Sequence, residues 1–245
     1  MSGLLWMTSY RQEANNMAIS ADTQLLFHWI PILLGLTLMS PWGESLGRSI
    51  SAKWPSMETK RGRTIGGMLL AMFGGFTVSA HTYWIHNKAK EIGSGDFCAG
   101  GGIWDCSSVI GNDEWNTMPF VDIPWGLAGM LAFCVFLWLT ISISKGLAET
   151  WVSAYIRYGL ALGGAGILIV MYLIYAEIEI GKLCQYCSTA HVSHLIATYG
   201  FFSLSKMHGT SEWGVGMMDD ARAARKERRK TRGYIAPTIK DDSEE

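Results

Sequence analysis

The sequence predicts an all-α integral membrane protein, built as a bundle of five membrane-spanning helices. Of the 245 residues, 49% are hydrophobic and only 17% are charged. The apolar residues gather in runs close to the ~20 residues that a helix needs to cross ~30 Å of hydrocarbon. Nearly all charged residues lie between or after these runs. A net charge of −1, with a single dense basic cluster near the C-terminus, argues against nucleic-acid binding.

The predicted spans are 23–40, 64–85, 123–144, 155–176 and 187–205. Helices are expected because isolated strands would leave backbone groups unpaired in lipid. The first span is short and contains Pro31. A removable signal peptide is the competing interpretation, but Arg11 is offset by Glu13 and Asp22, and no A-x-A-like cleavage site follows. We therefore expect the first span to be retained.

The distribution of Lys and Arg predicts the orientation in the membrane. Only Arg11, Lys88, Lys90 and Lys182 would lie on one side, and the rest of the 20 basic residues on the other. These others are Arg48, Lys53, Lys60, Arg61, Arg63, Lys145, Arg157, Lys206, Arg222, Arg225, Lys226, Arg228, Arg229, Lys230, Arg232 and Lys240. The asymmetry predicts an outer N-terminus and a cytoplasmic C-terminus, which requires an odd number of spans.

Four of the five cysteines form two pairs, Cys98 with Cys106 and Cys184 with Cys187. The second pair is a C-x-x-C at the start of the last span, where a helix N-terminus is expected to lower the thiol pKa. The predicted topology places both pairs on the outer side, where disulfides persist. Cys134 lies within an apolar run, and we expect it to be a small buried hydrophobe.

The two cysteine pairs can meet. About 20 residues separate His86 from Cys106, and such a loop extends over roughly 60 Å, whereas packed helices are only ~10 Å apart. Electrons could then pass by thiol–disulfide exchange, which requires direct attack of sulfur on sulfur. A dithiol at the lipid interface suggests a lipid-soluble quinone as the final acceptor.

The chain resembles the vitamin K epoxide reductase family, including its prokaryotic disulfide-forming members. The resemblance covers about residues 64–205 and rests on three motifs. They are Cys98-x7-Cys106 followed by Ser107-Ser108-Val109, then Ile123-Pro124 with Gly126 and Gly129, and last Cys184-x-x-Cys187. The order of the cysteine pairs separates the chain from DsbB-type proteins, in which the C-x-x-C comes first.

The resemblance implies a four-helix catalytic bundle over 64–206. Residues 1–63 then form an N-terminal segment that adds one membrane helix and a basic cytoplasmic loop, and 207–245 form a charged cytoplasmic tail. Many prokaryotic relatives carry a thioredoxin-like domain after the bundle, whereas the charged tail of this sequence is expected to be too short to form one. The resemblance therefore implies a thioredoxin-like thiol protein that acts in trans.

The resemblance also implies a role for each cysteine. Cys187 would face the quinone and donate electrons to it, while Cys184 would exchange with Cys106. Cys98 would complete the loop disulfide and accept electrons from the reduced partner. His191 lies one helical turn after Cys187, so it either hydrogen-bonds a quinone carbonyl or packs between helices. His194 is expected on a different face, in a packing role.

Two residues depart from the family pattern but remain candidates for quinone binding. Asn112 stands where the family commonly has Ser or Thr, so a role that needs a hydroxyl is in doubt. Trp125 stands where some relatives have Asn, and it would either stack on the quinone ring or anchor its helix at the interface.

The resulting hypothesis is a membrane thiol oxidoreductase that oxidises a thioredoxin-like partner and reduces a quinone of the ubiquinone or menaquinone type. Reduction of a quinone epoxide, as in vitamin K recycling, would share the same cysteine relay. A metal-binding protein is the alternative from another class, with the four paired cysteines and His191 as soft ligands. Purely structural disulfides are a further alternative, under which Cys187→Ala would leave thiol oxidation intact.

Overall fold

The computed structural model describes residues 23–92, 102–119 and 121–213, and these residues confirm the predicted all-α fold. Apart from two isolated β-bridges, their regular structure is helical. The helices are Thr23–Met39, α2 (Gly43–Ile50), α3 (Lys60–Ile92), α4 (Cys106–Ile110), α5 (Trp125–Lys145), α6 (Val152–Ile180) and α7 (Gln185–Met207), with short 3₁₀ helices at Pro55–Glu58 and Ser211–Trp213.

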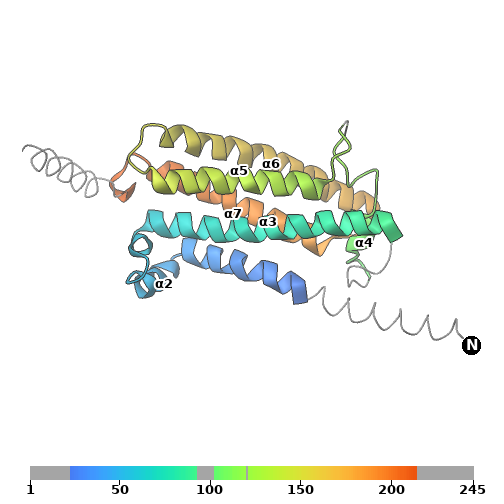
Figure 1. Ribbon diagram of the computed structural model, residues 1–245, viewed down its shortest axis with the longest axis horizontal. Helices are drawn as coiled ribbons and strands as arrows, with labels where there is room; N and C mark the ends of the chain where they lie inside the picture. Colours follow the sequence, from blue (N-terminus) through green and yellow to red (C-terminus); the bar gives the residue numbers. More distant parts are fainter. Residues whose placement is uncertain (1–22, 93–101, 120, 214–245) are drawn as a thin grey trace, which may run out of the picture.

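One long helix overlaps each predicted span, and these helices lie side by side along the length of the molecule (Figure 1). α3 packs against both α5 and α7, and α7 also packs against α6. The helices can approach one another closely where one of them has a glycine, which has no side chain. A Cβ on Gly75 would collide with Phe133 of α5 and Ser193 of α7, so this glycine lets three helices meet.

Three helices are long and apolar enough to cross a membrane, namely α3, α5 and α6. Thr23–Met39 and α2 would make a fourth if counted as one span, although the chain bends by 99° between them. α7 is not among them, because it carries polar side chains such as Thr189, Ser193 and His194, which are buried against its neighbours. The protein is thus an integral membrane protein, while the count of five spans stays a prediction.

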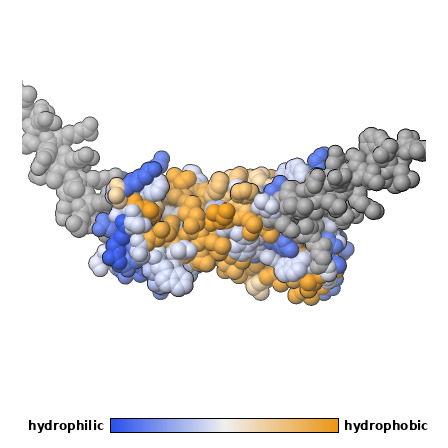
Figure 2. Space-filling view, turned by 90° about the horizontal axis from the view of Figure 1, so that it is seen from below, coloured by the Kyte–Doolittle hydropathy of each residue, from blue (hydrophilic) through white to orange (hydrophobic). Residues whose placement is uncertain are grey.

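The surface of the bundle matches a membrane environment. Apolar residues cover the middle of the face shown in Figure 2, and hydrophilic residues gather towards both ends. Large apolar side chains such as Leu168, Met171 and Ile178 on α6 are exposed. In water such a surface would promote association, but in lipid it is the expected contact surface.

The prediction that Cys134 is buried was wrong. The inward stripe of α5 contains Phe133, Phe136, Leu139 and Ile143, whereas the Cys134 side chain is exposed. Successive residues of a helix are rotated by about 100°, so the neighbour of an inward residue can face outward. Local hydropathy could not reveal this, because apolar residues occupy both faces of a membrane helix.

One end of the bundle gathers the cysteines. α6 ends at Ile180, and the next residue, Gly181, has a positive φ of 69° that turns the chain back towards α7. The returning segment pairs with the loop before α4. The Asp105 N–H donates to the Leu183 carbonyl at 3.0 Å, and the Leu183 N–H donates to the Ile103 carbonyl at 2.9 Å. These bonds dock the loop onto the entrance to the C-x-x-C.

The opposite end is covered by the residues after α7. Trp213 is buried and donates its indole N–H to the Leu147 carbonyl at 3.0 Å. The guanidinium of the buried Arg61 lies 5.3 Å from the centroid of the Trp213 ring. Residues up to Trp213, which the sequence assigned to the tail, therefore pack as part of the bundle.

Candidate functional site

Cys106, Cys184 and Cys187 meet at the N-terminus of α7. The sulfur of Cys106 accepts the Gln185 N–H at 3.2 Å, and the sulfur of Cys184 accepts the Cys187 N–H at 3.2 Å. The thiol of Cys184 is also within hydrogen-bonding reach of the other two sulfurs. Cys98 lies outside the described residues. The structure thus brings together three of the four predicted cysteines.

Asp105 fixes the start of α4 and with it the position of Cys106. Its carboxylate caps the helix by accepting the Ser108 N–H at 3.1 Å, and it also accepts the hydroxyls of Ser107 and Ser108. The hydrogen bond from the Ser108 side chain is the largest of the effects that lower the Asp105 pKa below 3.8. The two serines after Cys106 therefore serve the cap.

The expectation that the helix N-terminus lowers the thiol pKa was wrong for Cys184. This thiol is fully buried, and burial raises its pKa well above the ordinary value. Hydrogen bonds to Cys106 and Cys187 act in the same direction. Loss of water around a thiolate outweighs the partial charge of the helix end. Cys184 therefore holds its proton at neutral pH.

Glu177 is a site residue that the sequence analysis missed. It lies near the end of α6 and is only 4% exposed. Its Oε1 accepts the Cys184 N–H at 3.2 Å, and a carboxylate oxygen, the Cys184 sulfur and the Cys187 sulfur lie within 4.8 Å of one another. The available signal was an acidic residue inside an apolar run, which in a membrane protein usually marks a functional site.

An apolar cavity of about 320 Å³ opens beside Cys187. Its walls come from α3, α5, α6, α7 and the segment before α5, and most of its lining side chains are aliphatic or aromatic. A few polar groups interrupt this lining, namely Ser79, Thr82, Asn116, Glu177, Cys187, His191 and His194. This volume and this mixture of walls are typical of a small-molecule site.

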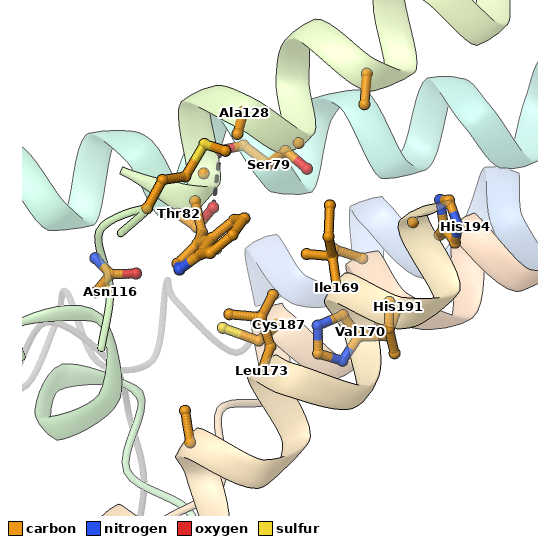
Figure 3. Close-up of a pocket in the computed structure, with 18 of the residues that line it drawn as sticks. Ser79, Thr82, Asn116, Ala128, Ile169, Val170, Leu173, Cys187, His191 and His194 are labelled. Atoms are coloured by element: carbon orange, nitrogen blue, oxygen red, sulfur yellow. Dashed lines mark hydrogen bonds between the residues drawn. The ribbon is translucent and has the colours of Figure 1, made fainter. Parts of the chain in front are cut away.

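Both histidines of α7 line this cavity, so the prediction that His194 lies on a different face was wrong. Figure 3 shows His191 close to Cys187 and His194 farther along the helix. His194 is buried, and its Nε2–H donates to the Gly163 carbonyl at 3.0 Å, which joins α7 to α6. No hydrogen bond of the His191 ring is seen within the described part of the chain. His191 is thus the histidine that can receive a ligand.

Trp125 lines the cavity, whereas Asn112 is not among the lining residues. The Trp125 indole N–H donates to the Trp115 carbonyl at 3.1 Å, which fixes the ring at the cavity wall. The Asn112 side-chain oxygen instead accepts the N–H groups of Glu114 and Trp115, as in an Asx turn. Its place in the structure is that of a turn former.

Asn116 is the asparagine that reaches the cavity, and sequence reasoning did not single it out. Its amide nitrogen donates to His86 Nδ1 at 2.8 Å and to the Ile110 carbonyl. These bonds orient the side chain and leave its amide oxygen on the cavity side (Figure 3). Asn112 and Asn116 lie in one loop, and composition alone does not separate a turn former from a cavity residue.

A second histidine cluster lies where the N-terminal helix packs on α3. His28 Nε2 is 3.2 Å from His81 Nδ1, and His28 Nδ1 is 3.0 Å from the Thr77 hydroxyl. Tyr186, between the two cysteines of the C-x-x-C, packs edge-on against both imidazoles. These histidines bond to partners within the protein, so the added helix braces the C-x-x-C from the side away from the cavity.

The cavity is suited to the head group of a quinone. Such a ring is flat and largely apolar, and the aliphatic and aromatic walls would cover it. Cys187 supplies a sulfur in the lining, and His191 and Asn116 supply further polar groups of the same lining. Of the ligands expected for a metal site, Cys184 and Cys187 lie with Glu177 in one group of potential ligand atoms within 4.8 Å of one another, and neither Cys106 nor His191 belongs to that group in the described ranges.

Comparison with known proteins agrees with this geometry. The family model described as the vitamin K epoxide reductase family matches residues 67–200, which is more than half of the chain. The match runs from α3 into α7 and includes all four paired cysteines. No curated protein and no solved structure matches the chain.

Proposed function

Because the chain belongs to the vitamin K epoxide reductase family and is therefore a membrane oxidoreductase of thiol and quinone chemistry, we propose that it forms disulfide bonds. In this proposal it oxidises a thioredoxin-like thiol protein in trans and passes the electrons to a ubiquinone- or menaquinone-type quinone. One observation carries the proposal: the Cys106 loop is docked on the C-x-x-C, and Cys187 lines an apolar cavity.

The relay begins at the loop. The reduced partner attacks the Cys98–Cys106 disulfide and leaves oxidised, and the loop keeps two thiols. Cys106 then attacks Cys184 of the oxidised C-x-x-C, because its sulfur lies against the first turn of α7. The attack releases Cys187 as a thiolate, while Cys98 resolves the Cys106–Cys184 bond. Each exchange breaks one S–S bond and forms one, so electrons move inwards without a free carrier.

The residues around the cavity have separate roles in binding the quinone. Trp125 covers one wall, while His191 and Asn116 offer hydrogen-bonding groups for the quinone oxygens. The bound quinone supplies a two-electron acceptor beside Cys187. Asn112 is left out, since its side chain is used within its turn.

The proposed topology places this site at the outer face. Five spans, an outer N-terminus and a cytoplasmic C-terminus agree with the basic residues of the described ranges, which fall mainly at the end of the bundle opposite the cysteines. The proposed units are an N-terminal segment (1–63), the catalytic bundle (64–206) and a charged tail (207–245), of which the residues up to Trp213 pack against the bundle. The thiol partner would then reach the loop from the oxidising compartment.

The proposal is tested with the purified full chain in lipid nanodiscs. A reduced thioredoxin-like protein is mixed with either a quinone or a quinone epoxide, and the loss of each acceptor is followed by absorbance. We expect loss of the quinone at the rate at which partner disulfide appears, and no loss in Cys187→Ala. Consumption of the epoxide alone would replace the proposal by epoxide reduction. Full thiol oxidation by Cys187→Ala would leave a purely structural role for the pair.

A further inference from the structure

Glu177 is a buried acid that the cysteine relay described above does not use. Its carboxylate accepts a hydrogen bond from the Cys184 N–H. It forms no ion pair with a Lys or Arg in residues 23–92, 102–119 and 121–213. Burying a carboxyl group without a cation is costly. Such a residue is expected to have a role in function.

Glu177 lies both beside the C-x-x-C sulfurs and in the wall of the cavity. A carboxylate oxygen lies within 4.8 Å of the sulfurs of Cys184 and Cys187, which become a disulfide in the reaction. Glu177 also belongs to the wall of the cavity, together with His191. Its main chain is held at the end of α6, where its carbonyl accepts the Lys182 N–H at 3.1 Å.

Oxidation of two thiols releases two protons as well as two electrons. Cys184 is buried and Cys187 is half-buried at the cavity wall, so an acceptor for the released protons is needed within the site. The titratable side chains around Glu177 and its part of the cavity are Cys106 on α4 and Cys184, Cys187, His191 and His194 on α7. His194 already bonds to Gly163, and the cysteines are the proton donors. In the described residues, Glu177 is the acceptor with an oxygen within 4.8 Å of both sulfurs.

We propose that Glu177 is the proton acceptor of the C-x-x-C, taking one proton when Cys184 and Cys187 form their disulfide and holding it at the cavity wall. The step converts two thiols and one carboxylate into one disulfide, one carboxylic acid, one released proton and two electrons. The electrons go to the quinone of the proposed function, on which this inference rests. Thiol S–H groups favour the ionised carboxylate, and a disulfide has no hydrogen to donate.

The test is the reduction potential of the C-x-x-C as a function of pH, measured without quinone. The full chain in nanodiscs is equilibrated with thiol–disulfide buffers from about pH 6 to about pH 8, below the ordinary thiol pKa of ~8.5. Alkylation and mass spectrometry then give the oxidised fraction of the Cys184–Cys187 peptide. Each released proton changes the equilibrium constant tenfold per pH unit, which is about 30 mV for a two-electron couple.

We expect the wild-type potential to fall by about 30 mV per pH unit, because one proton leaves and Glu177 keeps the other. Glu177→Gln keeps an acceptor for the Cys184 N–H but cannot take a proton, so its potential should fall by about 59 mV per pH unit. Glu179→Gln, an exposed acid on the same helix, is the matched control and should keep the wild-type slope. Glu177→Asp should restore the one-proton slope.

A two-proton slope in the wild type, or equal slopes for the wild type and Glu177→Gln, would overturn the inference. The wild-type measurement and Glu177→Asp remain decisive even if Glu177→Gln does not fold. In the quinone assay, Glu177→Gln should be slower by about 10²-fold near neutral pH and should recover as the pH rises. If the wild type shows the one-proton slope but does not reduce quinone, the proposed function fails instead.

Discussion

The two ends of the bundle are built alike but do different work. At each end, a segment outside the long helices docks on the helix termini through bonds to backbone carbonyls, from Asp105 to Leu183 at one end and from Trp213 to Leu147 at the other. The cysteine end brings sulfur atoms and a buried acid to the wall of a cavity. The opposite end places an aromatic ring over Arg61 and closes the core. A docked segment can therefore serve packing alone. The functional groups that it brings together distinguish the cysteine end from the opposite end.

This comparison predicts the largest effect at Cys187. Cys187→Ser should reduce quinone-reduction activity by at least about 10³-fold, because it removes the sulfur that lines the cavity. The midpoint of thermal unfolding should stay almost unchanged. Cys134→Ser, an exposed cysteine on α5, is the control and should keep full activity. If Cys187→Ser lost activity because it unfolded, with a clearly lower midpoint of thermal unfolding, the cysteine end would have a packing role like that of the opposite end.

The opposite end should show the reverse pattern. Trp213→Ala removes a buried ring, its hydrogen bond to Leu147 and its contact with Arg61. Such a truncation typically costs about 3 kcal/mol of the free energy of unfolding. Activity per folded molecule should remain that of the wild type, measured at a temperature where both are folded. Trp213→Phe keeps most of the ring and should lose about 1 kcal/mol.

The histidines separate ligand contact from packing within the cysteine end. His191→Ala removes a cavity histidine, and we expect the KM for quinone to rise about tenfold, equivalent to one hydrogen bond of ~1.4 kcal/mol. His28→Ala breaks the contacts with His81 and Thr77 on the other side of α7. It should lower the thermal midpoint and leave the KM unchanged. A change in KM for His28→Ala with none for His191→Ala would reverse the assignment.

The smallest predicted effect concerns the cap of α4. The pKa of Asp105 is lower in the folded state, so its contribution is complete above the unfolded carboxyl pKa of 3.8 and is lost as the pH falls through the folded value. Protection of the α4 amides against hydrogen exchange should therefore be constant from about pH 5 to 8 and fall only in stronger acid. Asp105→Ala should weaken the cap by about 1 kcal/mol at neutral pH, and Asp105→Asn by less. If the α4 amides lost their protection near pH 6, a group other than Asp105 would control the stability of this helix.

The sequence supports the fold well because hydropathy and helix length are strong signals in membrane proteins. The helix cores were found at every predicted span, and α3 and α6 extend several residues beyond their predicted ends. Hydropathy does not show which side of a helix faces lipid, which is why Cys134 was misplaced. The cysteines of the site were also readable, since their spacing is specific. Glu177 and Asn116 were not, because their roles depend on which segment returns to the C-x-x-C after α6.

The central claim, that electrons pass from the loop to the C-x-x-C by direct exchange, has one decisive measurement. In Cys98→Ser/Cys187→Ser, the paired cysteines that remain are Cys106 and Cys184, and neither resolving thiol is left. Mild oxidation followed by mass spectrometry should show a Cys106–Cys184 disulfide in nearly every molecule. Cys106→Ser/Cys187→Ser, which leaves Cys98 with Cys184, should show far less cross-linking. Absence of the Cys106–Cys184 disulfide, or equal yields in both variants, would contradict the relay.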